Sequence, residues 1–328
     1  MLRHRFAALV AACTAVLIFA GGLVTSTGSG LSVPDWPTTY GGNMFTFPLE
    51  HWVGGIRFEH GHRLIASTVG LLILVQAYWT WRAEPRAWVR TLAMAALAAV
   101  IAQGILGGVT VLWYLPDPVS IAHASLAQLV FSMATTIALV TSAGWLSGYA
   151  RAGAPPDDRV LQKIAIATTV MVYAQILMGA TMRHTEAGLA IPDVPWAFGR
   201  VVPDHWDPKI AVHFAHRVGA LLVSLFVLAT AGHVFYHHGR QRELVRPAML
   251  LIALVCVQVA LGAATVLSAK QYLVNSLHVV AGGAVLVTSL ALAIRCHRAR
   301  FASDVPAASP ATCATAAGAA DIAAGARA

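Results

Sequence analysis

The chain has 328 residues, of which 58% are hydrophobic and only 11% are charged. That composition is too apolar for an ordinary soluble domain of this length. The formal net charge of +8 does not indicate nucleic-acid binding, because most Lys and Arg residues gather in short connections between apolar segments. We therefore expect an all-α polytopic membrane protein that binds no nucleic acid.

Eight apolar stretches are long enough to cross a bilayer as helices, which takes about 20 residues each. In chain order they cover residues 5–24, 62–81, 91–113, 119–145, 160–181, 210–236, 247–268 and 272–294. The first stretch could be read as a secretory signal peptide, because Arg3 and Arg5 precede its apolar run. Its length and its counterpart at 160–181 favour a retained helix.

The distribution of positive charge predicts the orientation. Lys and Arg precede the first stretch, follow the last, and fill the connections after the second, fourth and sixth. The opposite side has fewer of them, spread over longer loops, so both termini should face the cytoplasm. Residues 301–328 are mostly Ala with Gly, Ser and Pro, and predict a disordered cytoplasmic tail.

The cysteines predict no structural disulfide. They form no CxxC pair, and none falls in an expected outer loop. They are Cys13, Cys256, Cys296 and Cys313.

Two halves of the chain, 1–150 and 151–300, repeat the same landmarks in the same order. The matched pairs are residues 30–37 with 188–195, His62-Arg63 with His216-Arg217, and residues 103–111 with 258–266. Each half then ends on a helix that carries a histidine. Because each half has four helices, an even number, both enter the membrane from the same side. We therefore predict two parallel-repeat four-helix bundles, an arrangement that can hold cofactors ligated from facing helices.

A histidine lies near the outer start of each of the second, fourth, sixth and eighth stretches. These residues are His62, His123, His216 and His278. A single histidine at a helix end could simply be an interfacial residue, but four in register and paired within each half favour ligation. Imidazole is a usual axial ligand of haem iron, whereas zinc or copper usually requires three or four converging ligands. The pattern therefore predicts two haem sites.

Charged neighbours distinguish the two sites. Arg63 and Arg217 each follow a histidine, either as helix-end cations near lipid phosphate or as forked partners of haem propionates. Glu59 precedes His62 by one helical turn, whereas His213 takes its place in the second half. Glu59 could be only a charge favoured by the helix dipole. As a site residue, it would make the first site the reactive one and leave the second to carry electrons.

Other polar and small residues receive structural interpretations. Small residues inside the apolar stretches favour close helix packing with room for a flat ring; they are Gly107, Gly108, Thr110, Gly262 and Thr265. Asp35 and Asp193, which lie between prolines, are expected in turns. The remaining histidines considered are expected in loops or on the surface, namely His60, His205, His233, His237, His238 and His297.

Residues 28–37 (GSGLSVPDWP) and 59–63 (EHGHR), together with His123, His216 and His278, closely resemble the haem A synthase family of cytochrome oxidase assembly proteins. The resemblance covers essentially residues 5–295. It implies an oxidoreductase acting on a CH3 group, which oxidises the C8 methyl of haem O to a formyl group with oxygen from water, giving haem A.

The resemblance also implies roles for individual residues. His216 and His278 would ligate the cofactor haem b in the second half, with Arg217 nearby. His62 and His123, with Arg63, would hold haem O in the first half. Glu59 would lie beside the reacting methyl, where a carboxylate can stabilise positive charge or activate water.

The family places the chain in the bacterial inner membrane, in contact with lipid. Its expected partners are haem O synthase and cytochrome oxidase assembly factors, while the electron acceptor and any homo-oligomer stay open. Some family members carry two cysteines in the outer loop after the first helix, but residues 25–60 contain none here. One alternative is a di-haem membrane electron carrier, which needs no carboxylate in one site only. Another is a haem chaperone, which would bind haem reversibly and without a permanently ligated redox site.

Overall fold

The computed structural model describes residues 2–146, 158–298 and 301. Within them, eight helices are long and apolar enough to cross a membrane, which confirms an all-helical protein with the expected number of spans. They are α1 (Leu2–Ser26), α2 (Ile56–Ala83), α3 (Ala87–Leu112), α4 (Asp117–Val140), α6 (Arg159–His184), α7 (Pro208–His238), α8 (Arg242–Leu267) and α9 (Tyr272–Cys296). The expected tail, apart from Phe301, lies outside the described residues, as does Cys313. The cysteines that are described are free, as predicted.

Helices α2 and α8 begin well before their apolar stretches, at Ile56 and Arg242. Helix α2 already includes Glu59 in its first turn, one turn before His62. Helix α8 extends past Pro247, which has no N–H to donate to the carbonyl of Glu243. Arg295 Nη1 donates to that carbonyl over 2.6 Å instead, so the helix continues towards its N-terminus without an unpaired backbone oxygen.

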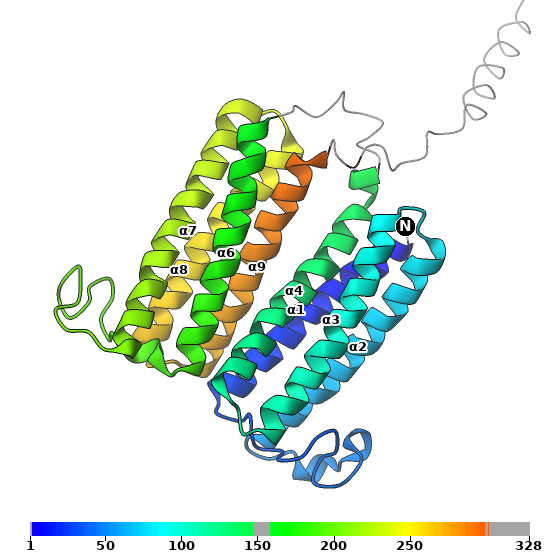
Figure 1. The fold of residues 1–328 in the computed structure, drawn as a ribbon, viewed down its shortest axis with the longest axis vertical. Coiled ribbons are helices and arrows are strands. Elements are labelled where there is room, and N and C mark those ends of the chain that lie inside the picture. The colour runs from blue at the N-terminus through cyan, green and yellow to red at the C-terminus, as the bar shows by residue number, and fades with distance from the viewer. Residues whose placement is uncertain (1, 147–157, 299–300, 302–328) are drawn as a thin grey trace, which may run out of the picture.

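The helices form two groups of four, which lie side by side in Figure 1. In the first group each helix packs against the next along the chain, and α4 closes the ring against α1. The second group, α6 to α9, closes in the same way. The two groups meet through α1 with α9 and through α4 with α6 and α9.

The two ends of the molecule differ. The long connections 27–55 and 185–207 lie at one end, here called the loop end, whereas the N-terminus of α1 and the C-terminus of α9 lie at the other, the terminal end (Figure 1). At the loop end each connection makes one isolated antiparallel bridge, Thr39 with Gly42 and Ala197 with Arg200. The two connections therefore bend in the same way.

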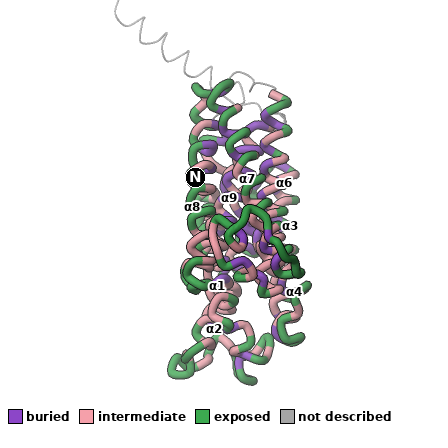
Figure 2. Tube along the Cα trace, turned by 90° about the vertical axis from the view of Figure 1, so that its left-hand side faces the viewer, coloured by how far each residue is buried: buried purple, intermediate pink, exposed green. Residues whose placement is uncertain are grey.

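Buried residues lie between helices, while many large apolar side chains face outwards. On α2, for example, Val69 and Ile73 are 1% exposed, whereas Leu71 is 60% exposed. Figure 2 shows buried and exposed positions interleaved along the helices. Exposed apolar surface on this scale fits contact with lipid.

Candidate functional site

Four half-buried histidines lie near the loop end, each within the first turns of its helix. They are His62 in α2, His123 in α4, His216 in α7 and His278 in α9. His62 is close enough to His123 for electrostatic interaction, and His216 to His278. The structure therefore brings together the histidine pair expected in each half.

Each imidazole of the first group lies against a glycine of a neighbouring helix. A Cβ atom built on Gly21 of α1 would come within 3.1 Å of His62 Cε1, and one on Gly107 of α3 within 3.2 Å of His123 Cε1. These distances are tighter than ordinary Cβ contacts. The rings therefore occupy space that only a residue without a side chain leaves free.

The second group repeats this arrangement. A Cβ atom on Gly179 of α6 would lie 3.0 Å from His216 Cε1, and one on Gly262 of α8 would lie 3.1 Å from His278 Cε1. We refer to Gly21, Gly107, Gly179 and Gly262 as the glycine seats. Gly21 and Gly179 were missed by the sequence reasoning, although they stand at the same offset between the halves as Gly30 and Gly188.

Polar contacts at Nδ1 hold the imidazoles of the second group. Gln175 Nε2 donates to the backbone carbonyl of His216 over 2.7 Å and lies 3.0 Å from its Nδ1. His278 Nδ1 lies 3.1 Å from the carbonyl oxygen of Gln258. His278 can donate its Nδ1 N–H to that carbonyl, which is the arrangement that orients an imidazole ligating a metal through the other nitrogen. The Gln175 amide is a donor, so it holds the His216 ring by donating to it.

The imidazoles of the first group have no such contacts. Nδ1 of His62 and Nδ1 of His123 are buried without a hydrogen-bond partner in the part of the chain that the structure describes. Gln103 Nε2 donates only to the backbone carbonyl of His123, over 2.9 Å. At the offset of the glycine seats, Leu17 takes the place of Gln175. The two groups therefore differ in how firmly they orient their rings.

Glu59 and His213 each accept a backbone N–H group of the adjacent connection, although one is a carboxylate and the other an imidazole. Glu59 is 3% exposed, and its Oε2 accepts the backbone N–H of Val33 over 2.7 Å. His213 is 2% exposed, and its Nδ1 accepts the N–H of Ile191 over 3.2 Å. Only Glu59 brings a carboxylate, whose Oε1 pairs with Arg63 Nη2 at 2.7 Å.

The terminal nitrogens of Arg63 bind the connection 27–55. Nη1 donates to the carbonyls of Asp35 and Thr38 over 2.7 and 3.1 Å, and Nη2 donates to the carbonyl of Val33 over 2.9 Å. With Glu59, these acceptors take up both terminal nitrogens. Binding of a haem propionate by Arg63 stays a prediction. In this structure its terminal N–H groups donate to the protein itself.

Arg217 binds the connection 185–207 in the same manner. Its terminal nitrogens donate to the carbonyls of Trp196, Ile191 and Asp193 over 2.7 to 2.9 Å. Both arginines thus fasten a connection to the helix that carries the neighbouring histidine.

The expected turn residues are confirmed. Asp35 accepts the backbone N–H groups of Tyr40 and Gly41, each over 2.8 Å, and Asp193 accepts the equivalent pair from Phe198 and Gly199. Burial alone would raise the pKa of Asp35, but hydrogen bonds from Gly41, the Thr38 hydroxyl and Tyr40 outweigh it and lower that pKa.

One aromatic contact is confined to the first group. The indole of Trp36 lies against α3, where a Cβ atom on Gly108 would come within 2.6 Å of the ring. At the equivalent positions the second group has Val194 and Ala263. The connection 27–55 therefore covers α3 next to the glycine seat of His123.

Two histidines expected in loops or on the surface are buried. His60 is 0% exposed, with Nδ1 3.1 Å from Thr39 Oγ1 and its ring against Trp52. The connection folds back over α2, which helical periodicity could not indicate. His238 is 6% exposed because it contacts Asp158 at the terminal end. His205 is exposed, as expected.

A polar contact joins the groups at the loop end. Arg183, in the last turn of α6, donates from Nη2 to the carbonyl of Gly22 over 2.7 Å and to Ser26 Oγ over 2.8 Å, both in α1. Its Nε is buried without a partner among the described residues. Arg183 also interacts electrostatically with His278. Sequence reasoning counted it only as a loop charge.

Comparison with known proteins decides the family. The model of a family of cytochrome oxidase assembly proteins, COX15-CtaA, matches residues 49–292. The chain belongs to this family. A protein named heme A synthase from Shouchella clausii is 32% identical over 255 residues, which cover 77% of this chain and 83% of the relative. A second, from Symbiobacterium thermophilum, is 31% identical and covers 81% of this chain and 87% of its own length. A third, from Halalkalibacterium halodurans, is 26% identical and covers 83% and 90%.

Proposed function

We propose that this membrane protein is a haem A synthase, an oxidoreductase that converts the C8 methyl of haem O to a formyl group and so yields haem A for cytochrome oxidase. Its family and the names of its relatives support this activity. The structural observation that carries it is the presence of two half-buried imidazole pairs at one end of a membrane bundle, each ring on a glycine seat.

The second group suits a resident cofactor. His216 and His278 have contacts at Nδ1 that orient their rings, and the glycine seats give each ring its space. We propose that these two residues would hold haem b through its iron. When bound, haem b supplies one-electron redox chemistry.

The first group suits an exchangeable substrate. His62 and His123 have no Nδ1 partner among the described residues, so less protein structure fixes their rings. A site binds its metal less tightly when fewer hydrogen bonds orient the ligating side chains. This fits haem O, which must enter as substrate and leave as haem A.

Glu59 is the acid–base group of the proposed reaction. One oxygen accepts the N–H of Val33 and the other pairs with Arg63. A carboxylate offers about four lone-pair sites, so capacity remains for a proton or for water. Oxidation of a methyl group releases protons, and a fixed carboxylate can accept one or stabilise nearby positive charge.

Arg183 is a better placed propionate partner than Arg217. The terminal nitrogens of Arg217 bind loop carbonyls, whereas Arg183 has a buried, unpartnered Nε and lies near His278. A guanidinium N–H binds a carboxylate well. We assign Arg63 and Arg217 an indirect role, in which they hold the connections over the two sites.

The two groups are proposed to be parallel repeats, 1–150 and 151–300. The contact of α1 with α9 and that of α6 with α4 exchange when the halves are exchanged, and the bridges in the two connections also correspond. With positive charge at the terminal end, both termini would face the cytoplasm. The haem sites would then lie near the outer face of the bacterial inner membrane.

Pigment analysis tests the activity. The chain is expressed with a haem O synthase in a host that lacks haem A, and the extracted haems are separated. Haem A is the expected product. A folded, haem-loaded protein that yields only haem B and haem O would contradict the enzyme and favour a di-haem electron carrier.

A further inference from the structure

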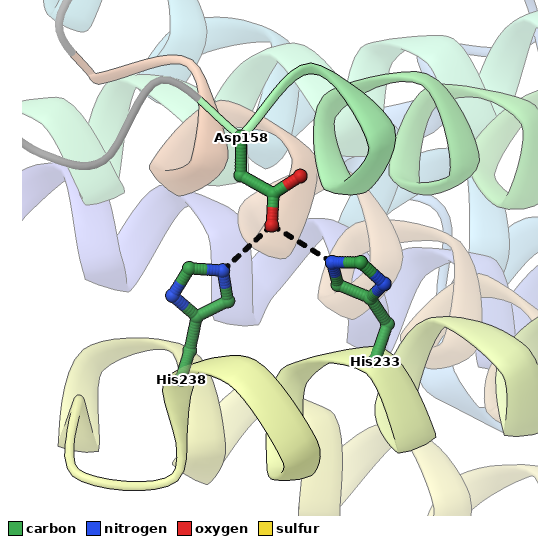
Figure 3. Close-up of side chains that lie close together, drawn as sticks. All are labelled: Asp158, His233 and His238. Atoms are coloured by element: carbon green, nitrogen blue, oxygen red, sulfur yellow. Dashed lines mark hydrogen bonds and ion pairs between the residues drawn. The ribbon is translucent and has the colours of Figure 1, made fainter.

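Three potential metal ligands converge at the terminal end, remote from the four histidines of the loop end. Asp158 precedes α6, and His233 and His238 lie in the last turns of α7 (Figure 3). Nε2 of each histidine lies 2.8 Å from the same atom, Oδ2 of Asp158. The ligand atoms all lie within 4.8 Å of one another.

The backbone fixes these ligands. Asp158 caps α6, and its Oδ1 accepts the N–H of Leu161 over 2.9 Å, which leaves Oδ2 for the imidazoles. Gln241 Nε2 lies 3.3 Å from His238 Nδ1, so the amide can donate to this ring and help hold it in place. The side chains of Asp158 and His233 are 19% exposed and that of His238 is 6% exposed. The cluster is therefore mostly buried, but enough of it is exposed for an ion to reach it from solvent.

Among the described residues of the first group, no such cluster occurs. At the offset of the histidine repeat, Trp79 and Glu84 replace His233 and His238. Glu84 is part of an ion-pair cluster instead, with Arg86 at 2.7 Å and Arg3 at 3.4 Å. An ion pair is thus sufficient to join helices at this end, and two imidazoles on one carboxylate oxygen call for a different explanation.

We propose that Asp158, His233 and His238 form a binding site for a divalent transition-metal ion, for which zinc is the best match. Two imidazole nitrogens and one carboxylate oxygen form a recurrent zinc ligand set, with water completing the coordination. Zinc–ligand distances of about 2.0–2.1 Å at a tetrahedral angle separate the ligand atoms by about 3.3 Å. The 2.8 Å contacts would therefore open by about half an ångström on binding.

Zinc binding to the haem-loaded, full-length protein in detergent tests this site. The protein carries a purification tag without histidines and is dialysed against zinc chloride with a competing chelator. Three variants remove one ligand each: Asp158→Asn, His233→Gln and His238→Gln. Gln can still donate a hydrogen bond to Asp158, so the two histidine variants preserve a purely structural contact.

The matched control is His205→Gln. His205 Nδ1 lies 2.9 Å from Asp204 Oδ1 in a single exposed pair on a connection at the loop end. The wild type and this control should each bind one zinc ion with the same affinity. The three ligand variants should bind zinc about 100-fold more weakly or worse, because loss of even a supporting contact costs 10- to 100-fold.

Thermal unfolding gives a second measurement that does not need the variants. Zinc should raise the unfolding temperature of the wild type, because it binds the folded state. The site is refuted if the wild type binds no more zinc than His238→Gln, if zinc binding survives all three substitutions, or if zinc leaves the unfolding temperature unchanged. Each readout is independent of haem A formation.

Discussion

The two four-helix groups seat their histidines in the same way but hold them differently. Every ring lies on a glycine of a neighbouring helix, yet only His216 and His278 have contacts at Nδ1. The corresponding atoms of His62 and His123 have none among the described residues. The glycine seats thus fix the position of each imidazole, while hydrogen bonds at Nδ1 determine how firmly that imidazole is oriented.

A second difference concerns charge. Glu59 and His213 accept equivalent backbone N–H groups, so the fold at this position does not require a carboxylate. What the carboxylate adds to the first group is an ionisable oxygen one helical turn before His62 on α2. This is why the proposed chemistry is assigned to the first group and electron transfer to the second.

Removing a ligand of the second group should have the largest effect. His216→Ala should abolish bound haem b, because it takes away one proposed axial ligand, and haem A formation should be lost with it. The pyridine haemochrome of the purified protein measures this. His205→Ala, in an exposed pair, should keep its haem, and full haem b content in His216→Ala would show that the cofactor has been assigned to the wrong residues.

Neutralising Glu59 should separate chemistry from cofactor binding. Glu59→Gln retains an oxygen for the N–H of Val33 but removes the charge, so haem A formation should fall by about 100-fold or more while haem b stays bound. Haem extraction and absorbance spectra measure the two quantities on one sample.

The matched substitution lies at the equivalent position. His213→Gln likewise retains an acceptor for Ile191 and should leave haem A formation within about twofold, because it keeps this hydrogen bond and removes no carboxylate. Equal losses in both variants, or loss of haem b in Glu59→Gln, would reverse the assignment of the halves.

Removing the hydrogen-bond donor next to the His216 ring should weaken haem b binding less than removing His216 itself. Gln175→Leu copies Leu17 into the second group and should weaken haem b binding by about 10- to 100-fold, visible as faster transfer of haem to an excess of a soluble haem acceptor. Leu17→Gln should leave haem b retention unchanged. If Gln175→Leu holds haem b as firmly as the wild type, Nδ1 contacts do not explain the difference between the groups.

The sequence predicts most of the scaffold, since helix length and apolar composition are local properties. It also identifies the four histidines and the turns of Asp35 and Asp193. The glycine seats at Gly21 and Gly179 depend on which helices face each other, and no local pattern reveals that. The burial of His60 depends on a connection that folds back over α2, and that of His238 on Asp158, which is far away in the chain.

Arg183 marks a difference between the two groups at the place where they meet. Thr25 stands at its equivalent position in α1, so at this place between the groups only one side carries a guanidinium, which reaches Gly22 and Ser26. A symmetric dimer of identical four-helix subunits would carry this residue twice or not at all. Two groups in one chain can therefore differ where they meet, with a cation on the side of His278 and a neutral hydroxyl opposite.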